Sequence, residues 1–330
     1  MPDWCRRARV AALAAVCVAL LLSRGGGLGP LKAAAQTAVA PSKSFEILEV
    51  RPSFYMIAAA SANIGVQVGE DGVVVVDAGS AADAPAVLAA IKSISPKPIR
   101  YIIDTGPDAD HVGGNEALAK AGEKLFAGRR NGADSVAPIV SVEGVLQYMT
   151  NKFPAAAVPN EVFHYSRKYM YLNGEAIEVL SQPAAHTDAD AFVFFRRSDV
   201  VVAGDVLDTR QFPVIDITRG GSIQGEIAAL NRLVDLAVPS VPVVTREAGT
   251  IVVPGHGRLC DQYDVVEYRD MVTIIRDRVA DLIKAGRSLA EVKAAQPAKG
   301  YVGRYGNPGG AWTEAHFIEA VFRSLSREKP

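Results

Sequence analysis

Apolar residues in the first third of this chain occur in short runs separated by turn-forming residues, a pattern typical of β-strands. The runs cover Phe54–Ile57, Gly65–Val68 and Val73–Val76, with the turn Glu70-Asp71-Gly72 between the last two. A further run at Arg100–Asp104 predicts another strand. This part of the chain is therefore expected to form a sheet.

The second half of the chain contains two predicted β-hairpins. Asn173-Gly174, a two-residue turn signal, separates Tyr169–Leu172 from Ala176–Leu180. A short polar turn separates Phe192–Phe195 from Val200–Ala203. Two strand-rich halves with helices between them predict an α/β fold.

Helical patterns lie between and after these strands. A proline in the first turn favours a helix over Asp83–Ile91, and Gly122 closes a predicted helix over Val112–Ala121. Residues 128–160 lack strong periodicity, so we expect a loop with one short helix at Val142–Met149.

The C-terminal part, residues 263–330, is predicted to be a helical extension. Val265–Ala285 has a helical pattern, and the capping box that starts at Ser288 opens another helix. Thr313–Ser326 predicts a last amphipathic helix.

Residues 299–311 are so rich in glycine that we expect neither a helix nor a regular strand there. This loop has two interpretations. It covers apolar surface, which we favour, or it brings Tyr301, Arg304 or Tyr305 close to a functional site.

Residues 1–35 have the composition of a signal peptide. A basic start precedes the apolar run Val10–Leu22, and small residues allow cleavage before Gln36. The run is shorter than the about 20 residues that span a bilayer, so cleavage is favoured over a membrane anchor. We expect an exported protein, periplasmic or extracellular, with a linker at 36–45 and no stable membrane insertion after cleavage.

Charge and cysteine content narrow the classes of partner. Removal of residues 1–35 leaves 30 basic against 35 acidic residues, a net charge of −5, with no block of like charge. This balance argues against nucleic-acid binding and leaves a small-molecule substrate as the expected partner. Cys260 would remain as a single cysteine, which we expect to be a small buried apolar residue.

Acidic and imidazole side chains crowd together in residues 104–115. Asp108, Asp110 and His111 follow an apolar run and precede Gly113-Gly114. Carboxylates this close disfavour each other's ionised form, whereas a divalent metal keeps them ionised. Side chains of the same kind follow in three later segments, at His186, Asp205 and His256. Such ligands at four strand ends suit a two-metal hydrolytic centre.

The order of these segments resembles the metallo-beta-lactamase fold superfamily. Its motif, His-x-His-x-Asp-His, is followed by a His, a bridging Asp and a final His. The resemblance covers roughly residues 46–262, includes the strand that approaches Asp77, and implies an αββα sandwich. The chain departs from the motif at its first two histidines, where it has Gly106 and Asp108.

The resemblance implies that Asp110, His111 and His256 hold one metal and that Asp205 bridges to a second. It also implies that Asp110 is catalytic, because its carboxylate would hold the nucleophilic water and accept its proton.

The second metal position is expected to consist of Asp108, His186 and Asp205, because Gly106 has no side chain. A carboxylate in place of an imidazole moves metal preference from zinc toward iron or manganese. Zinc, as one or two ions, remains the first expectation from the family. Thr187 or Asp190 is expected to orient the imidazole of His186. Weaker candidate ligands are Asp104, His164 and His316.

The function implied is hydrolysis of a small ester, thioester, lactone or lactam by metal-activated water. An alternative is a metal-binding but catalytically impaired protein that binds a ligand or partner, because two family histidines are missing. Redox chemistry at iron ranks last, since no flavin domain is present. Metal content per chain would separate the first two interpretations.

Overall fold

The computed structural model describes residues 45–58, 61–125, 135–240 and 249–327. Residues 42–330 belong to one compact unit. The expected signal peptide and all but the last residue of the expected linker lie outside the described residues, and the domain boundary at 262 stays a prediction. In the described part of the chain, no helix is both long enough and apolar enough to cross a lipid bilayer.

The N-terminal half builds a seven-stranded mixed sheet, in the order β1 to β7. Neighbouring strands are antiparallel from β1 to β4 and parallel from β4 to β7. The strands are β1 (Glu46–Arg51), β2 (Phe54–Ala58), β3 (Asn63–Val68), β4 (Val73–Val76), β5 (Ile99–Ile103), β6 (Ile139–Val142) and β7 (Glu161–Phe163). Each strand predicted in this half is confirmed within one or two residues at its ends.

The second half builds a five-stranded sheet in the order β12-β11-β10-β9-β8, in which only β11 and β12 are parallel neighbours. Its strands are β8 (Arg167–Leu172), β9 (Glu175–Gln182), β10 (Asp190–Phe195), β11 (Val200–Asp208) and β12 (Ile251–His256). Both predicted hairpins are confirmed. Asn173 and Gly174 have φ angles of 53° and 73°, which the tight turn between β8 and β9 requires.

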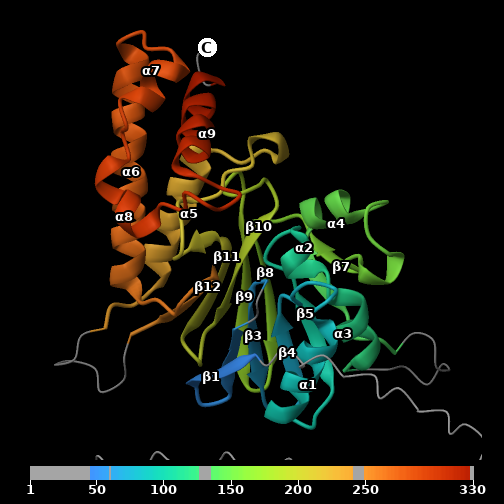
Figure 1. Ribbon diagram of the computed structural model, residues 1–330. Helices are drawn as coiled ribbons and strands as arrows, with labels where there is room; N and C mark the ends of the chain where they lie inside the picture. The colour runs from blue at the N-terminus through green and yellow to red at the C-terminus, as the bar shows by residue number, and fades with distance from the viewer. Residues whose placement is uncertain (1–44, 59–60, 126–134, 241–248, 328–330) are drawn as a thin grey trace, which may run out of the picture. The chain divides into compact units, whose positions relative to one another are not determined.

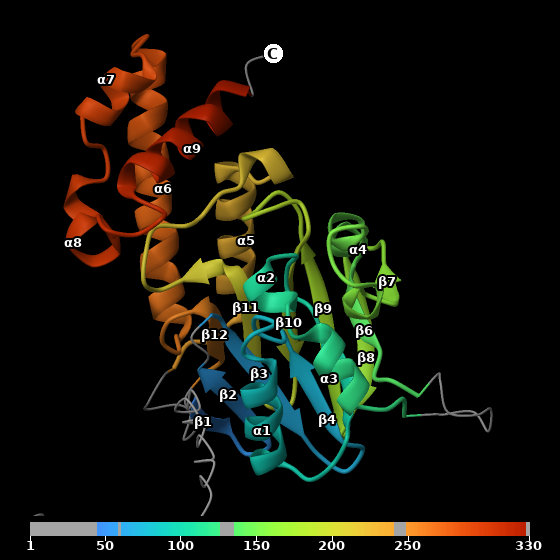
Figure 2. The ribbon, with the colours of Figure 1, turned by 45° about the vertical axis from the view of Figure 1, so that its right-hand side comes forward.

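The two sheets pack face to face, with helices on both outer faces (Figure 1). Phe54 of β2 and Phe195 of β10 meet edge to face between the sheets, with ring centroids 4.8 Å apart. Helices α1 (Ala84–Ile94) and α3 (Asn115–Ala121) share a core with the seven-stranded sheet. Helices α5 (Ile223–Leu236) and α6 (Gln262–Lys284) share one with the five-stranded sheet (Figure 2). This arrangement confirms the predicted α/β sandwich.

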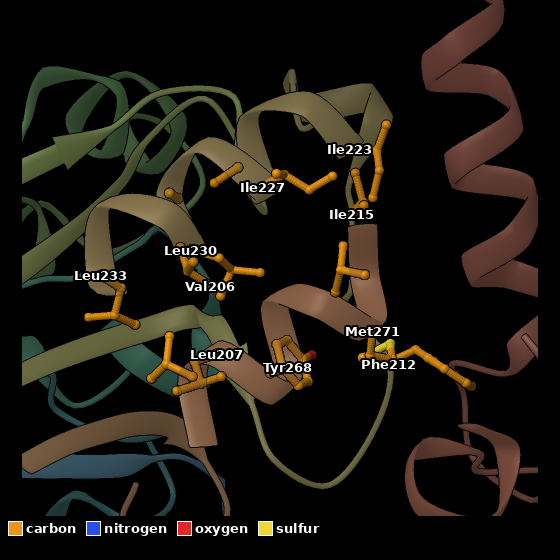
Figure 3. Close-up of a cluster of buried hydrophobic side chains, with 14 of the residues drawn as sticks. Val206, Leu207, Phe212, Ile215, Ile223, Ile227, Leu230, Leu233, Tyr268 and Met271 are labelled. Atoms are coloured by element: carbon orange, nitrogen blue, oxygen red, sulfur yellow. The ribbon is translucent and has the colours of Figure 1, made fainter. Parts of the chain in front are cut away.

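The C-terminal helices extend the layer that covers the five-stranded sheet. Figure 3 shows Val206 and Leu207 of β11 packed with Leu230 of α5 and with Tyr268 and Met271 of α6. Helices α7 (Leu289–Ala294) and α9 (Glu314–Arg327) follow α6 and contact it. The predicted capping box at the start of α7 is present.

The glycine-rich stretch 299–311 corrects one prediction, because it contains a 3-10 turn, η3 (Lys299–Tyr301), and helix α8 (Val302–Tyr305). Packing outweighs the weak helix propensity of glycine here. The ring of Tyr305 lies 5.4 Å from that of Tyr268 on α6, and the side chain is 4% exposed. Arg304 forms an ion pair with Glu267, also on α6. The stretch therefore covers apolar surface of α6, which agrees with the interpretation that we favoured from the sequence.

Two other predictions need correction. Residues 135–163 contain the predicted helix as α4 (Glu143–Met149), but also β6, β7 and a 3-10 turn, η1 (Ala155–Ala157). All four residues of β6 are buried, so no polar alternation marks it as a strand. The helix predicted over Val112–Ala121 is split into α2 (Ala109–Val112) and α3, because the chain passes close to Ala78 at Gly114. A Cβ on Gly114 would lie 2.2 Å from the Ala78 carbonyl oxygen.

Candidate metal centre

The first three candidate ligands follow strand β5. Asp108 is the N-cap of α2, and Asp110 and His111 lie within that helix. The close contact of Gly114 with Ala78 holds α2 against the end of β4. The motif therefore lies at the carboxyl ends of the parallel strands β4 and β5.

The other three candidate ligands come from the five-stranded sheet. His186 lies in the connection between β9 and β10, Asp205 lies in β11, and His256 ends β12. Strands β11 and β12 are parallel neighbours, with Gly204 opposite Pro254. Asp205 and His256 consequently occur at the same edge of this sheet.

The structure brings Asp110, His111 and His256 into one group, with possible ligand atoms all within 4.8 Å of one another. Oδ2 of Asp110 lies 3.3 Å from Nε2 of His256. Oδ1 of Asp205 lies 3.1 Å from Nε2 of His111 and 3.2 Å from Nε2 of His256. This is the residue set expected for the first metal position.

Asp108, His186 and Asp205 form the second group, again with all ligand atoms within 4.8 Å. Nε2 of His186 lies 2.7 Å from Oδ2 of Asp108 and 3.8 Å from Oδ2 of Asp205. Asp205 therefore presents one carboxylate oxygen to each group, which is the geometry of a bridging acid.

Electrostatics at the centre favour additional positive charge. Burial alone would lower the pKa of each imidazole, but the neighbouring carboxylates outweigh it. Asp205 and Asp77 raise the pKa of His111 well above its ordinary value. Asp108 and Asp205 raise the pKa of His186 to about 10, and Asp110 and Asp205 raise that of His256 to about 9.

The side chains present fit a divalent metal at the first group. Nδ1 of His111 lies 2.8 Å from Oδ2 of Asp77, so in the neutral ring Nδ1–H donates and the lone pair is on Nε2. Nε2 is the nitrogen that faces Asp205. Two imidazoles and two carboxylates are ligands that zinc, iron and manganese accept.

Asp77 supports the centre from behind His111, a contact that the sequence did not predict. Its carboxylate accepts hydrogen bonds from Thr105 N at 2.8 Å and Thr105 Oγ1 at 2.7 Å, in addition to its contact with His111. Its φ of 63° is unusual for a residue other than glycine, and such strain is characteristic of functional sites. The sequence did contain a signal for this residue, because Asp77 is an acid placed directly after the apolar run Val73–Val76.

The prediction that Thr187 or Asp190 orients the imidazole of His186 is wrong. Asp190 accepts hydrogen bonds from the backbone N–H and hydroxyl of Thr187, at 2.7 and 2.8 Å. Nδ1 of His186 instead donates to the backbone carbonyl of Val214, at 2.7 Å. Because this partner is a backbone carbonyl 28 residues away, no side chain in the sequence could have indicated it.

The weaker candidate ligands lie outside both groups. Asp104 is buried and accepts a hydrogen bond from Asn115, and burial raises its pKa well above the ordinary value. His164 is exposed and pairs with Glu143, and His316 bonds to its neighbour Thr313. Cys260 is buried, as predicted, and burial raises its pKa to about 12.

Arg219 is a second residue at the centre that the sequence reasoning missed. It ends the 3-10 turn η2 (Ile217–Arg219), and its Nη1 donates to Oδ1 of Asp108. Its position is 111 residues from its partner in sequence, so no local pattern connects the two.

Solved structures with the same fold include an alkylsulfatase and two metallo-beta-lactamases. The inverting sec-alkylsulfatase Pisa1 from Pseudomonas sp. is 16% identical, with a TM-score of 0.62 over 84% of this chain and 50% of that chain. The chain thus spans half the length of that protein. The metallo-beta-lactamase from Pontibacter korlensis is 17% identical, with a TM-score of 0.54 over 70% of this chain and 99% of that chain. The DIM-1 metallo-beta-lactamase is 15% identical, with a TM-score of 0.52 and coverages of 70% and 97%.

Sequence comparisons add one match. No curated protein sequence matches this chain. The model of the metallo-beta-lactamase superfamily matches residues 58–131, the segment that contains Asp77, Asp108, Asp110 and His111. Residues 58–131 thus match the metallo-beta-lactamase superfamily in sequence, and the chain shares the αββα fold of the solved metallo-beta-lactamases.

Proposed function

We propose that this protein is an exported, metal-dependent hydrolase of a small-molecule substrate. The observation that carries the proposal is the position of Asp205, whose two oxygens face the two groups of ligand-type side chains. Hydrogen bonds to Asp77 and Val214 orient His111 and His186 so that each directs Nε2 toward these carboxylates. Such support is typical of imidazoles that bind a metal.

The proposed chemistry is water activation at the first group. A divalent metal held by Asp110, His111, Asp205 and His256 would lower the pKa of a bound water and supply hydroxide near neutral pH. The side chain of Asp110 is 38% exposed, more than the other carboxylates of the centre, so substrate and water can reach it. We assign Asp110 the role of orienting the attacking water and accepting its proton.

Zinc is the proposed metal, as one or two ions, with iron or manganese as alternatives. The imidazoles of His111 and His256 favour zinc at the first group. At the second group the carboxylates of Asp108 and Asp205 accompany one imidazole, that of His186. This oxygen-rich set favours harder cations such as iron or manganese.

The proposed substrates are small esters, thioesters, lactones or lactams, and we add sulfate esters. The two lactamase structures match 70% of this chain, whereas the sec-alkylsulfatase structure matches 84%. Because these identities are below 20%, the wider match to the sec-alkylsulfatase serves here only to add sulfate esters to the substrates that are tested. The centre suits any of these bonds, because each is cleaved by attack of an activated water.

The test is hydrolysis of this substrate panel by the mature protein, first stripped with a chelator and then loaded with zinc, manganese or iron. We expect turnover that requires metal and that falls by about 100-fold or more in Asp110→Asn, the range for loss of a general base. His164→Ala is the matched control, because this exposed histidine lies outside the centre. Turnover that persists without metal would contradict the proposal.

The alternative function is a metal-binding but catalytically impaired protein. Gly106 and Asp108 stand where the family motif has histidines, which favours this alternative. It predicts bound metal in the stripped and reloaded protein, without turnover of any panel substrate. A protein that binds no metal would exclude both functions.

Export rests on the N-terminal sequence. The mature chain is proposed to start near Gln36, in the periplasm or outside the cell. N-terminal sequencing of protein from those fractions tests this, and a full-length chain confined to the cytoplasm would contradict it.

A further inference from the structure

The guanidinium of Arg219 contacts both residues that belong only to the second group. Nη1 donates to Oδ1 of Asp108. Nη2 lies 3.5 Å from Nε2 of His186, the nitrogen that would otherwise bind a metal. Asp108 is thus bonded on one oxygen by Arg219 and on the other by His186.

Arg219 is held in this position by contacts on its other sides. Nε donates to Oδ2 of Asp216 at 2.6 Å, and the backbone N–H of Arg219 donates to Oδ1 of the same residue at 3.1 Å. The carbonyl of Arg219 accepts from Asp188 N at 3.0 Å. Its Cζ lies 5.0 Å from the centre of the Tyr148 ring on α4, a cation–π distance.

These contacts distinguish Arg219 from a surface arginine. Its side chain is only 18% exposed, and it makes charge-assisted hydrogen bonds to two carboxylates, Asp108 and Asp216. Burial alone would lower its pKa, but the bonds to Asp108 and Asp216 raise it instead, so the guanidinium stays charged at every accessible pH.

A second divalent metal fits this position poorly. Gly106 supplies no ligand, one oxygen of Asp108 is bonded to Arg219, and Nε2 of His186 faces both Asp108 and the guanidinium. A dication bound by Asp108, His186 and Asp205 would lie beside a fixed positive charge, which weakens its binding. The first group shows no such contact with an arginine among the interactions of the described residues.

We propose that the guanidinium of Arg219 takes the place of the second metal. The centre then holds one divalent ion, at Asp110, His111, Asp205 and His256, and Arg219 supplies the second positive charge. This inference rests on the proposed metal centre and narrows its one or two ions to one.

The test is metal stoichiometry, measured by zinc and cobalt titration against a competing chelator and by native mass spectrometry. Wild type is expected to take up one equivalent. Arg219→Met removes the charge and is expected to take up a second equivalent, with the d–d absorption of a second cobalt site as an independent readout. Arg219→Lys, which keeps a positive charge, is expected to remain at one equivalent. Arg196→Ala, which removes an arginine paired with Glu178 away from the centre, is the matched control.

Wild type that takes up two equivalents of similar affinity would overturn the inference without touching the proposed function. So would Arg219→Met that stays folded by circular dichroism and still takes up one equivalent. Wild type that takes up no metal would overturn the proposed function itself, and this inference with it. Because wild type alone decides between one and two ions, the proposal stays testable even if the Met variant does not fold.

Discussion

The two groups of ligand-type side chains share Asp205 but differ in how the surrounding chain treats them. The first, with Asp110, His111 and His256, is supported by the carboxylate of Asp77 behind His111. The second, with Asp108 and His186, is in contact with the guanidinium of Arg219. The first group is arranged so that it could bind a metal cation, whereas the second group is already paired with the positive charge of Arg219.

This difference shows that the number of bound metal ions cannot be inferred from the ligand-type residues alone. In both groups the possible ligand atoms lie within 4.8 Å of one another. What separates them is the identity of the residue behind each ligand: an acid behind His111 strengthens it as a donor, whereas an arginine at Asp108 competes with a metal for the same oxygen.

The largest expected effect on this comparison is that of His256→Ala. Removal of a direct ligand should weaken metal binding at the first group by more than the about 10–100-fold typical of a lost supporting partner. Chelator competition measures the affinity, and the exposed His164→Ala serves as control. Unchanged stoichiometry at low free metal would show that the first group is not the metal site.

Asp77→Asn should have the next largest effect. The amide keeps the shape of the side chain but no longer draws the Nδ1 proton of His111, so metal affinity should fall by about 10–100-fold. Measured against Thr105→Val, which removes only a hydroxyl bonded to Asp77, the loss should be clearly larger. Equal effects of the two substitutions would mean that Asp77 has a structural role only.

Asp108→His should have a smaller effect, and at the second group only. It supplies an imidazole and removes one of the two carboxylates bonded to Arg219, so zinc affinity there should rise, by about tenfold at most while Arg219 remains. Combined with Arg219→Met, the gain should exceed that of either single substitution. A wild-type protein with two equal zinc sites would refute the distinction between the groups.

The smallest expected effect is a pH dependence of stability in the metal-free protein. The pKa of His186 is raised from the ordinary 6.5 to about 10 and that of His256 to about 9, so the folded state holds these protons more tightly than the unfolded state. This stabilisation is fully present below about pH 6.5 and is lost as pH rises to about 9–10. The Tm of chelator-treated protein should therefore fall over that interval.

Zinc affinity should rise over the same interval, because fewer protons have to be displaced. His256→Ala should show a shallower decline of Tm than wild type, since one of the imidazoles with a raised pKa is gone. A Tm that does not depend on pH in this window would contradict the assignment of these charges.

Much of the fold was predictable because strand and turn patterns are local. Alternation and turn residues located β2 to β5 and β8 to β11. Strands β6 and β7 were missed. The four residues of β6 are all buried, so this strand lacks the alternation that marks a half-buried strand, and β7 has only three residues. The helical turn at Val302–Tyr305 was missed because burial of Tyr305 against Tyr268, which outweighs glycine propensity, is a long-range contact.

By itself, the sequence determined the kinds of ligand and their order along the chain. Acids and histidines at strand ends are visible because they interrupt apolar runs, and their grouping follows from the family motif. Only the tertiary structure decided what stands behind each ligand. Asp77 lies 34 residues from His111, and Arg219 lies 111 residues from Asp108. Those contacts arise where the loops of two sheets meet at one edge, and a pairing of that kind depends on packing, which no local pattern encodes.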